Sequence, residues 1–129
     1  MFPAYAGVIL GYKMKQIGFF KEMNLYADTG SIKDAIVKEI NYDKWKVIAY
    51  LKNGKRIALC PRNAIDCITG NPISTSFSIY NDMDQEYEWG DFLAYHIEKY
   101  NINLPDEFLK KIECDTGEKV MMDLSLPNA

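Results

Sequence analysis

The stretch that decides the expected fold is residues 45–60, WKVIAYLKNGKRIALC. Two apolar runs flank Asn53-Gly54, a dipeptide that favours a two-residue type I′ turn because both central residues there have positive φ. This turn would place Ile48 opposite Leu59 in an antiparallel pair. Both faces of such a hairpin are largely apolar, so the sequence predicts a central hairpin at about 45–60 that is covered on both sides.

The segments around this hairpin show helical patterns. Ser31 begins a capping-box pattern, and apolar residues then recur at helical spacing over 31–40. A second apolar stripe runs over 91–101, and a third helix is expected at 105–112, where Pro105 and two acids form a first turn. A short helix is also expected over 62–68. The predicted fold class is therefore α+β, with the hairpin packed by helices, and we expect Ile36, Ile48, Leu59 and Ile97 to be buried.

Length and composition indicate one domain. The chain has 129 residues, of which 48% are hydrophobic and 26% charged, close to the averages of globular proteins. We therefore expect a single domain over 1–129. Residues 3–7, Pro-Ala-Tyr-Ala-Gly, resemble peptides translated from short inverted DNA repeats. One hypothesis is that 1–22 are a non-native N-terminal extension with the natural start at Met14 or Met23. The alternative is an ordinary strand over 8–12.

Charge is distributed unevenly along the chain. The net charge is −3, but residues 80–118 carry −8 and residues 1–79 carry +5. The sequence pI of about 5.1 argues against a nucleic-acid-binding protein, which needs a basic face. The acidic part contains NDMDQEYEWGD at 81–91, where acids alternate with aromatic and other residues. The candidate partner-binding residues lie in this segment: Asp82, Asp84, Glu86, Tyr87, Glu88, Trp89 and Asp91.

Three interpretations of this acidic segment stay open. It could be a docking surface for a basic protein, in which the acids steer the encounter and Tyr87 and Trp89 anchor it. It could be a calcium site, because Asp82, Asp84 and Glu86 have the spacing of an EF-hand start, although the later EF-hand positions do not fit. It could also be a solvated loop before the next helix, with Trp89 buried where that helix begins.

Other residues offer weaker signals. His96 lies on an apolar helix face, where a structural role is favoured over catalysis. Cys60 precedes a predicted helix start and Arg62, which could lower the pKa of its thiol, although a structural role is again favoured. Basic residues gather around the predicted hairpin, and we interpret them as edge and turn charges rather than a nucleic-acid site: Lys44, Lys46, Lys52, Lys55, Arg56 and Arg62.

The sequence also predicts a compartment. The three cysteines, Cys60, Cys67 and Cys114, form no Cys-x-x-Cys pair and no even-numbered disulfide framework. No charged segment precedes the short apolar run near the N-terminus, and no stretch approaches a membrane span. We therefore expect a cytoplasmic protein that does not bind a membrane, a cofactor or a metal. We expect it to be a monomer or a small oligomer.

Two segments resemble the immunity proteins of bacterial toxin systems, including contact-dependent growth inhibition. These are SIKDAIVKEINYDKWKVIAYLKNGKRIALCP at 31–61 and SIYNDMDQEYEWGDFLAYHIEKYNI at 78–102. The resemblance implies a small acidic domain that binds one cognate toxin domain and blocks its active site. It implies no catalytic residues.

We therefore expect an immunity protein whose partner is a basic toxin domain of the nuclease or ribonuclease class. No phosphate-binding glycine loop, nucleophile elbow or metalloprotease motif is present, so we expect no enzyme. Two alternatives stay open. One is a small enzyme or ligand-binding regulatory domain that uses His96 and the Cys60–Arg62 junction. The other is a mobile-element protein that inhibits a host nucleic-acid enzyme.

Overall fold

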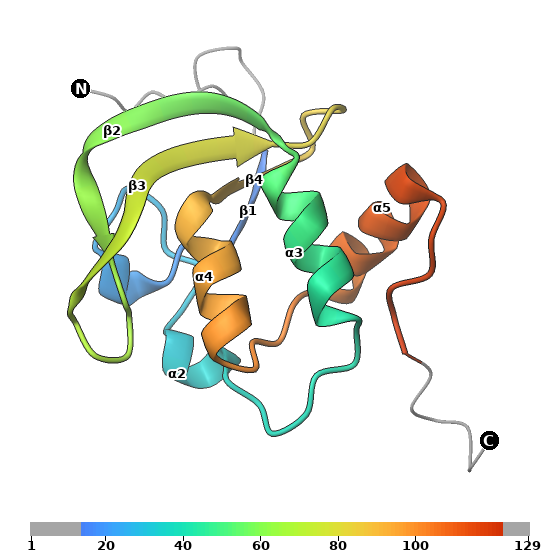
Figure 1. The fold of residues 1–129 in the computed structure, drawn as a ribbon, viewed down its shortest axis with the longest axis horizontal. Helices are drawn as coiled ribbons and strands as arrows, with labels where there is room; N and C mark the ends of the chain where they lie inside the picture. The colour runs from blue at the N-terminus through green and yellow to red at the C-terminus, as the bar shows by residue number, and fades with distance from the viewer. Residues whose placement is uncertain (1–13, 123–129) are drawn as a thin grey trace.

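The protein folds as a four-stranded mixed sheet with helices packed against it (Figure 1). The computed structural model describes residues 14–122, apart from the side chains of residues 62 and 74–76. The strands are β1 (Lys15–Ile17), β2 (Lys55–Ile65), β3 (Pro72–Asn81) and β4 (Tyr87–Gly90). The helices are α2 (Ile32–Ala35), α3 (Lys44–Lys52), α4 (Asp91–Lys99) and α5 (Asp106–Thr116), with a 3-10 turn η1 (Lys21–Met23). The α+β class is confirmed.

The sheet has the strand order β1-β4-β3-β2. β3 pairs antiparallel with both β2 and β4, whereas β1 pairs parallel with β4. Helix α3 lies between α4 and α5 (Figure 1). The register aligns four polar residues across the four strands, in the order Gln16, Glu88, Asn81 and Lys55.

The predicted hairpin at 45–60 is wrong, because its first half is helix α3. The Asp43 side chain caps this helix by accepting a hydrogen bond from the Lys46 backbone N–H. Val47, Ile48 and Leu51 are buried, which is the i, i+1, i+4 spacing of one helical face. A short apolar run fits a strand and a buried helix equally well, and the two cannot be separated by periodicity alone.

Gly54 is required for a reason other than the predicted turn. Gly54 is not one of the described residues with a positive φ, so it does not have the backbone conformation that the predicted turn requires. Instead, a Cβ built on Gly54 would lie 2.6 Å from Trp89 Cζ2 and 3.1 Å from the Asn81 carbonyl oxygen. Glycine lets the chain pass from α3 into β2 directly over the edge of the indole ring.

The prediction of a helix over 62–68 is also wrong, since β2 continues to Ile65. β2 pairs with β3 through several register shifts and forms one edge of the sheet. The edge position explains why Leu59 is 57% exposed and not part of the core. Ile36 is also exposed, whereas the predicted burial of Ile48 and Ile97 is confirmed.

The helix predicted over 31–40 shortens to α2. Ser31 caps it as predicted, by accepting from the Lys33 N–H. Glu22 from the preceding turn accepts from the Ile32 N–H, which satisfies a backbone donor of the first helical turn. The chain leaves the helix at Ile36, which pairs with Ile102 as an isolated bridge, so a tertiary contact replaces the later helical turns. The helices predicted at 91–101 and 105–112 are confirmed as α4 and α5.

Part of the N-terminal segment belongs to the fold. Within the proposed extension at 1–22, β1 pairs with β4, and Phe19 and Phe20 are buried in the core. Residues 1–13 lie outside the described residues, so the possible strand over 8–12 does too.

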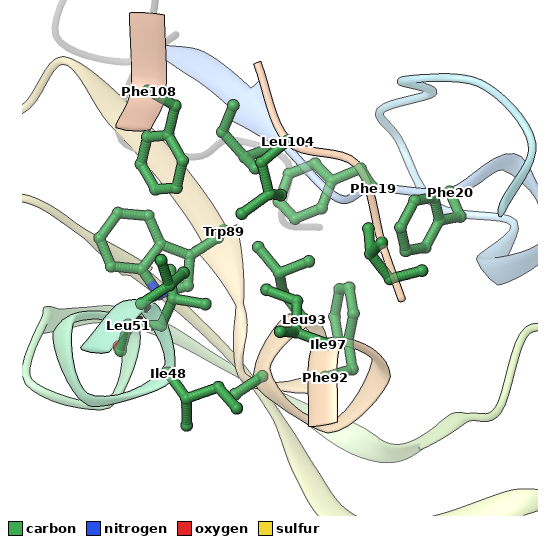
Figure 2. Close-up of a cluster of buried hydrophobic side chains, with 14 of the residues drawn as sticks. Phe19, Phe20, Ile48, Leu51, Trp89, Phe92, Leu93, Ile97, Leu104 and Phe108 are labelled. Atoms are coloured by element: carbon green, nitrogen blue, oxygen red, sulfur yellow. Dashed lines mark hydrogen bonds between the residues drawn. The ribbon is translucent and has the colours of Figure 1, made fainter. Parts of the chain in front are cut away.

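The core joins all of these elements, and Figure 2 shows its centre. Trp89 lies between α3 and α5, with its indole ring 5.8 Å from Phe108. Its Nε1–H donates to the Leu51 carbonyl oxygen at 3.1 Å. Phe92 of α4 packs against Phe19 and Phe77. The large aromatic side chains therefore connect the sheet to each of the long helices.

Candidate partner-binding site

The structure divides the seven predicted binding residues into three groups by exposure. Asp84 and Glu86 are exposed on the β3–β4 loop, as predicted. Asp91 is partly buried. The remaining four are buried: Asp82, Tyr87, Glu88 and Trp89. The expectation that Tyr87 and Trp89 are exposed anchors is wrong, because their rings pack against Phe108 of α5. The alternative, in which Trp89 is buried just before α4, describes the structure.

Asp82 shapes the loop from inside. Its Oδ1 accepts hydrogen bonds from the backbone N–H groups of Glu86 at 2.9 Å and Tyr87 at 2.8 Å. Its carbonyl oxygen also accepts from the Gln85 N–H at 3.0 Å, where Gln85 has a φ of 60°. The buried carboxylate thus holds a tight turn that presents residues 83–86 to solvent.

The ammonium group of Lys111, on α5, lies at the centre of four carboxylates. The Nζ atom is 3.4 Å from Asp82 Oδ2, 3.2 Å from Glu86 Oε1 and 3.0 Å from Asp115 Oδ1, and it also pairs with Asp84. The Lys111 side chain is only 11% exposed. Burial acts to lower its pKa, but hydrogen bonds to Asp84, Asp115 and Glu86 outweigh this and raise the pKa. Three negative charges of the cluster remain uncompensated.

The same geometry bears on the calcium interpretation. Oxygen atoms of Asp82, Asp84 and Glu86 lie within 4.8 Å of one another, as the spacing suggested. However, the Lys111 ammonium is in contact with all three carboxylates. A lysine therefore supplies the positive charge that an EF-hand loop obtains from its ion.

A pocket of about 580 Å³ opens beside this cluster. It lies between α3, the β3–β4 loop and the end of α5. Its charged lining consists of four carboxylates and two ammonium groups, so the pocket is acidic. The lining residues are Lys46, Ala49, Tyr50, Asn53, Gly54, Lys55, Asn81, Asp82, Met83, Asp84, Trp89, Asp115, Thr116, Glu118 and Val120.

Tyr50 connects the pocket to the core. Its ring lies 5.9 Å from Trp89 and 6.3 Å from Phe108, and its hydroxyl donates to Asp115 Oδ2 at 2.5 Å. Burial and the hydrogen bond to Asp115 raise the pKa of the phenol, so it stays a neutral donor. Asp115 is therefore held between Tyr50 and Lys111, which fixes one carboxylate of the pocket wall.

His96 has a structural role, as favoured from the sequence. It is fully buried, and its Nε2 accepts from the Cys67 backbone N–H at 2.9 Å. Nδ1 then carries the proton and donates to the Phe92 carbonyl oxygen at 2.8 Å. Burial lowers the pKa of the imidazole. Both ring nitrogens are occupied, so neither is available to act on a substrate.

The Cys60–Arg62 junction lies within β2. No helix begins after Cys60, so the helix N-terminus on which the reactive-cysteine interpretation depended is not there. The basic residues also have ordinary positions, since Lys44, Lys46 and Lys52 belong to α3, and Lys55, Arg56 and Arg62 belong to the edge strand β2. Charges on an edge strand discourage pairing with other chains, so the interpretation from the sequence fits the three residues of β2, whereas it is wrong for the three lysines of α3.

Asp66 is a buried carboxylate that the sequence analysis missed. It accepts hydrogen bonds from the Tyr95 and Tyr100 hydroxyls at 2.7 and 2.8 Å, and from the backbone N–H groups of Ile68 and Thr69. Lys99 pairs with it at 3.3 Å. Burial alone would raise the pKa of Asp66, but these bonds lower it strongly. The only sequence signal is the spacing of Tyr95 and Lys99 on α4, with Tyr100 directly after the helix.

Comparison with known proteins adds no assignment. No family model matches the chain, and neither the curated proteins nor the solved structures give a significant match. Between residues 14 and 122, no helix has the length and apolar character needed to cross a bilayer.

Proposed function

We propose that the protein is a cytoplasmic immunity protein that binds a basic toxin domain and covers its active site. The observation that carries this proposal is the cluster of four carboxylates around the single ammonium of Lys111. The uncompensated negative charge faces solvent on the β3–β4 loop and borders an open pocket. A surface of this kind complements a positively charged cleft.

The charge supports a nuclease as the toxin. An enzyme that cleaves nucleic acid binds phosphates through Lys and Arg side chains, so its cleft is basic. Carboxylates of an inhibitor can occupy the positions of those phosphates and pair with the same side chains. Complementary charge also speeds the encounter, which matters for an inhibitor that must reach a toxin before its substrate does.

Apolar contacts come from residues other than those predicted. Met83 lies in the β3–β4 loop between Asp82 and Asp84 and is 93% exposed. Trp45 on α3 is 60% exposed and lies one helical turn before Ala49, which lines the pocket. Large exposed apolar side chains near an acidic patch provide the buried area that holds an interface together. Met83 and Trp45 therefore replace Tyr87 and Trp89 as the proposed anchors.

Growth rescue tests this proposal. The candidate partner is any toxin domain encoded by a gene adjacent to this one, expressed alone so that it stops growth. Co-expression of the wild-type chain should restore growth. The double variant Asp84→Asn/Glu86→Gln should lose rescue, because Asp82 and Asp115 still pair with Lys111 and keep the fold while the exposed charge is gone.

The matched control is Glu39→Gln/Glu98→Gln, which removes two exposed charges outside the site. It should rescue growth as well as the wild type. No rescue by the wild-type chain would contradict the immunity function. Equal rescue by both double variants would show that the toxin binds elsewhere on the molecule.

A further inference from the structure

The pocket beside the carboxylate cluster combines charge with an apolar wall. Asp84, Asp115 and Glu118 contribute carboxylates, and Ala49, Tyr50 and Val120 contribute apolar surface. We propose that this pocket binds one arginine side chain of the partner, with the guanidinium between the carboxylates of Asp84 and Asp115 and the stem against Ala49 and Tyr50. This inference rests on the proposed function, because it names what the partner inserts into the same site.

The charge of the pocket favours one additional cation. Asp82 is fully buried and lines the pocket. Its Oδ2 accepts no hydrogen bond and lies 3.4 Å from Lys111 Nζ. That one ammonium is shared with Asp84, Glu86 and Asp115. Asp82 Oδ2 therefore has one shared ammonium as its cationic partner, so a second cation nearby lowers the electrostatic energy of the whole cluster.

The pocket wall is organised before any partner arrives. The Tyr50 hydroxyl and the Lys111 ammonium hold the two oxygens of Asp115. Lys46 pairs with Glu118 at 3.2 Å, and Asp82 fixes the turn that carries Asp84. Acceptors that are already positioned lose little entropy when a ligand binds.

The chemistry selects arginine over lysine. A guanidinium has five N–H donors in a planar fork and can bridge two carboxylates, whereas an ammonium is a compact point charge. A guanidinium also stacks on aromatic rings, and the half-buried ring of Tyr50 lines the pocket. The carboxylates of the pocket belong to separate residues, Asp84, Asp115 and Glu118. A planar set of N–H donors can contact more than one of them, whereas a second ammonium could contact them only from a single point.

The test is an NMR titration of the full chain with N-acetyl-argininamide, with N-acetyl-lysinamide as the matched probe at equal ionic strength. The arginine probe should shift the backbone amide signals of Asn53, Gly54 and Thr116, which line the pocket. The lysine probe should bind about threefold or more weakly, as expected from the loss of a bridging, stacked guanidinium.

Two variants locate the binding. Asp84→Asn/Glu118→Gln removes pocket charge and leaves Asp82, Glu86 and Asp115 to pair with Lys111, and it should weaken arginine binding about fivefold. Ala49→Met fills the pocket without changing its charge and should block binding. The control Glu39→Gln/Glu98→Gln should bind like the wild type. Equal affinity for both probes, or shifts that neither pocket variant alters, would overturn the proposal.

The outcome is separable from that of the proposed function. Arginine binding that depends on Asp84 and Glu118, together with no growth rescue, would leave the pocket assignment standing and remove the immunity function. Growth rescue that depends on Asp84 and Glu86, together with no arginine selectivity, would leave the immunity function standing and overturn the arginine pocket.

Discussion

Within residues 14–122, three buried carboxylates have three different environments. Asp66 receives several hydrogen bonds and an ion pair, and Asp82 holds a turn beside Lys111. Glu88 accepts hydrogen bonds from Gln16 and Tyr26 only through Oε2, whereas its Oε1 has no hydrogen-bond partner. Burial raises the pKa of Glu88 while hydrogen bonding lowers that of Asp66. The partners of each carboxylate, and not burial alone, decide which form is stable.

We expect Asp66→Asn to lower the free energy of unfolding at neutral pH by about 2–3 kcal/mol, because hydrogen bonds to a charged acceptor are lost. The folded-state pKa of Asp66 is lowered, so its contribution is present above the unfolded-state pKa of about 3.9. That contribution is lost as the pH falls through the folded-state pKa. Urea unfolding of both proteins across this acidic range measures the effect.

The difference in the free energy of unfolding between wild type and Asp66→Asn should therefore disappear in acid. Asp34→Asn, an exposed aspartate on α2, serves as the control and should change stability by less than about 0.5 kcal/mol. A gap that is independent of pH would show that Asp66 contributes by shape rather than by charge.

Glu88→Gln should have the opposite effect. The folded-state pKa of Glu88 is raised, so its favourable contribution is present below the unfolded-state pKa and is lost as the pH rises through the folded-state value. Asn81 lies opposite Glu88 on the neighbouring strand, and its Oδ1 also has no hydrogen-bond partner. A glutamine amide at position 88 could donate to this oxygen. We expect Glu88→Gln to stabilise the protein at neutral pH by about 1 kcal/mol, with the gain disappearing in acid. Thermal melts of both proteins at several pH values measure this effect, and a loss of stability at neutral pH would contradict the account.

At the level of elements, the sequence predicted helices better than it predicted the sheet. α4 and α5 have long apolar stripes and acidic first turns, which are local signals. The run Val47 to Leu51 fits both a helix and a strand, and the wrong choice followed from the Asn53-Gly54 dipeptide. β2 pairs with β3 and β3 pairs with β4, but the pairing of β1 with β4 joins residues over 70 positions apart. No local pattern specifies such a contact.

Gly54→Ala tests the junction between α3 and β2. The new Cβ would meet Trp89 Cζ2 at 2.6 Å, so we expect a loss of about 1–3 kcal/mol from overpacking. Phenylalanine at position 89 lacks the ring atom that clashes. Gly54→Ala should therefore cost at least about 0.5 kcal/mol less in a Trp89→Phe background. A double-mutant cycle by urea unfolding measures this coupling, and additive effects would place the strain elsewhere.

Ile48→Ala and Leu59→Ala separate the observed fold from the predicted hairpin. Ile48 is buried on α3 and should cost about 2–5 kcal/mol when truncated. Leu59 is exposed on β2 and should cost less than about 0.5 kcal/mol. The predicted hairpin would give both residues large effects. Comparable losses for the two variants in urea unfolding would therefore favour the hairpin over the structure.

At the scale of the whole molecule, folding concentrates the charge that the sequence distributes. The excess of acids in residues 80–118 was visible from composition. The sequence could not show that Lys111 of α5 reaches the β3–β4 loop, because that contact depends on how α5 packs against Tyr87 and Trp89. For the same reason, the alternating pattern at 81–91 could not reveal that Tyr87 and Trp89 are buried. It also could not reveal that Asp84 and Glu86 are exposed whereas Asp82 and Glu88 are buried.

The most direct test of the central claim is the rate of association with the toxin domain that the chain neutralises in the growth test, measured at low and at physiological salt. The claim is that exposed carboxylates on the β3–β4 loop steer a basic partner. We expect the wild-type rate to fall steeply with added salt, and the Asp84→Asn/Glu86→Gln variant to associate about tenfold or more slowly at low salt with a weaker salt dependence. Unchanged association by this variant, with melting as in the wild type, would contradict the claim.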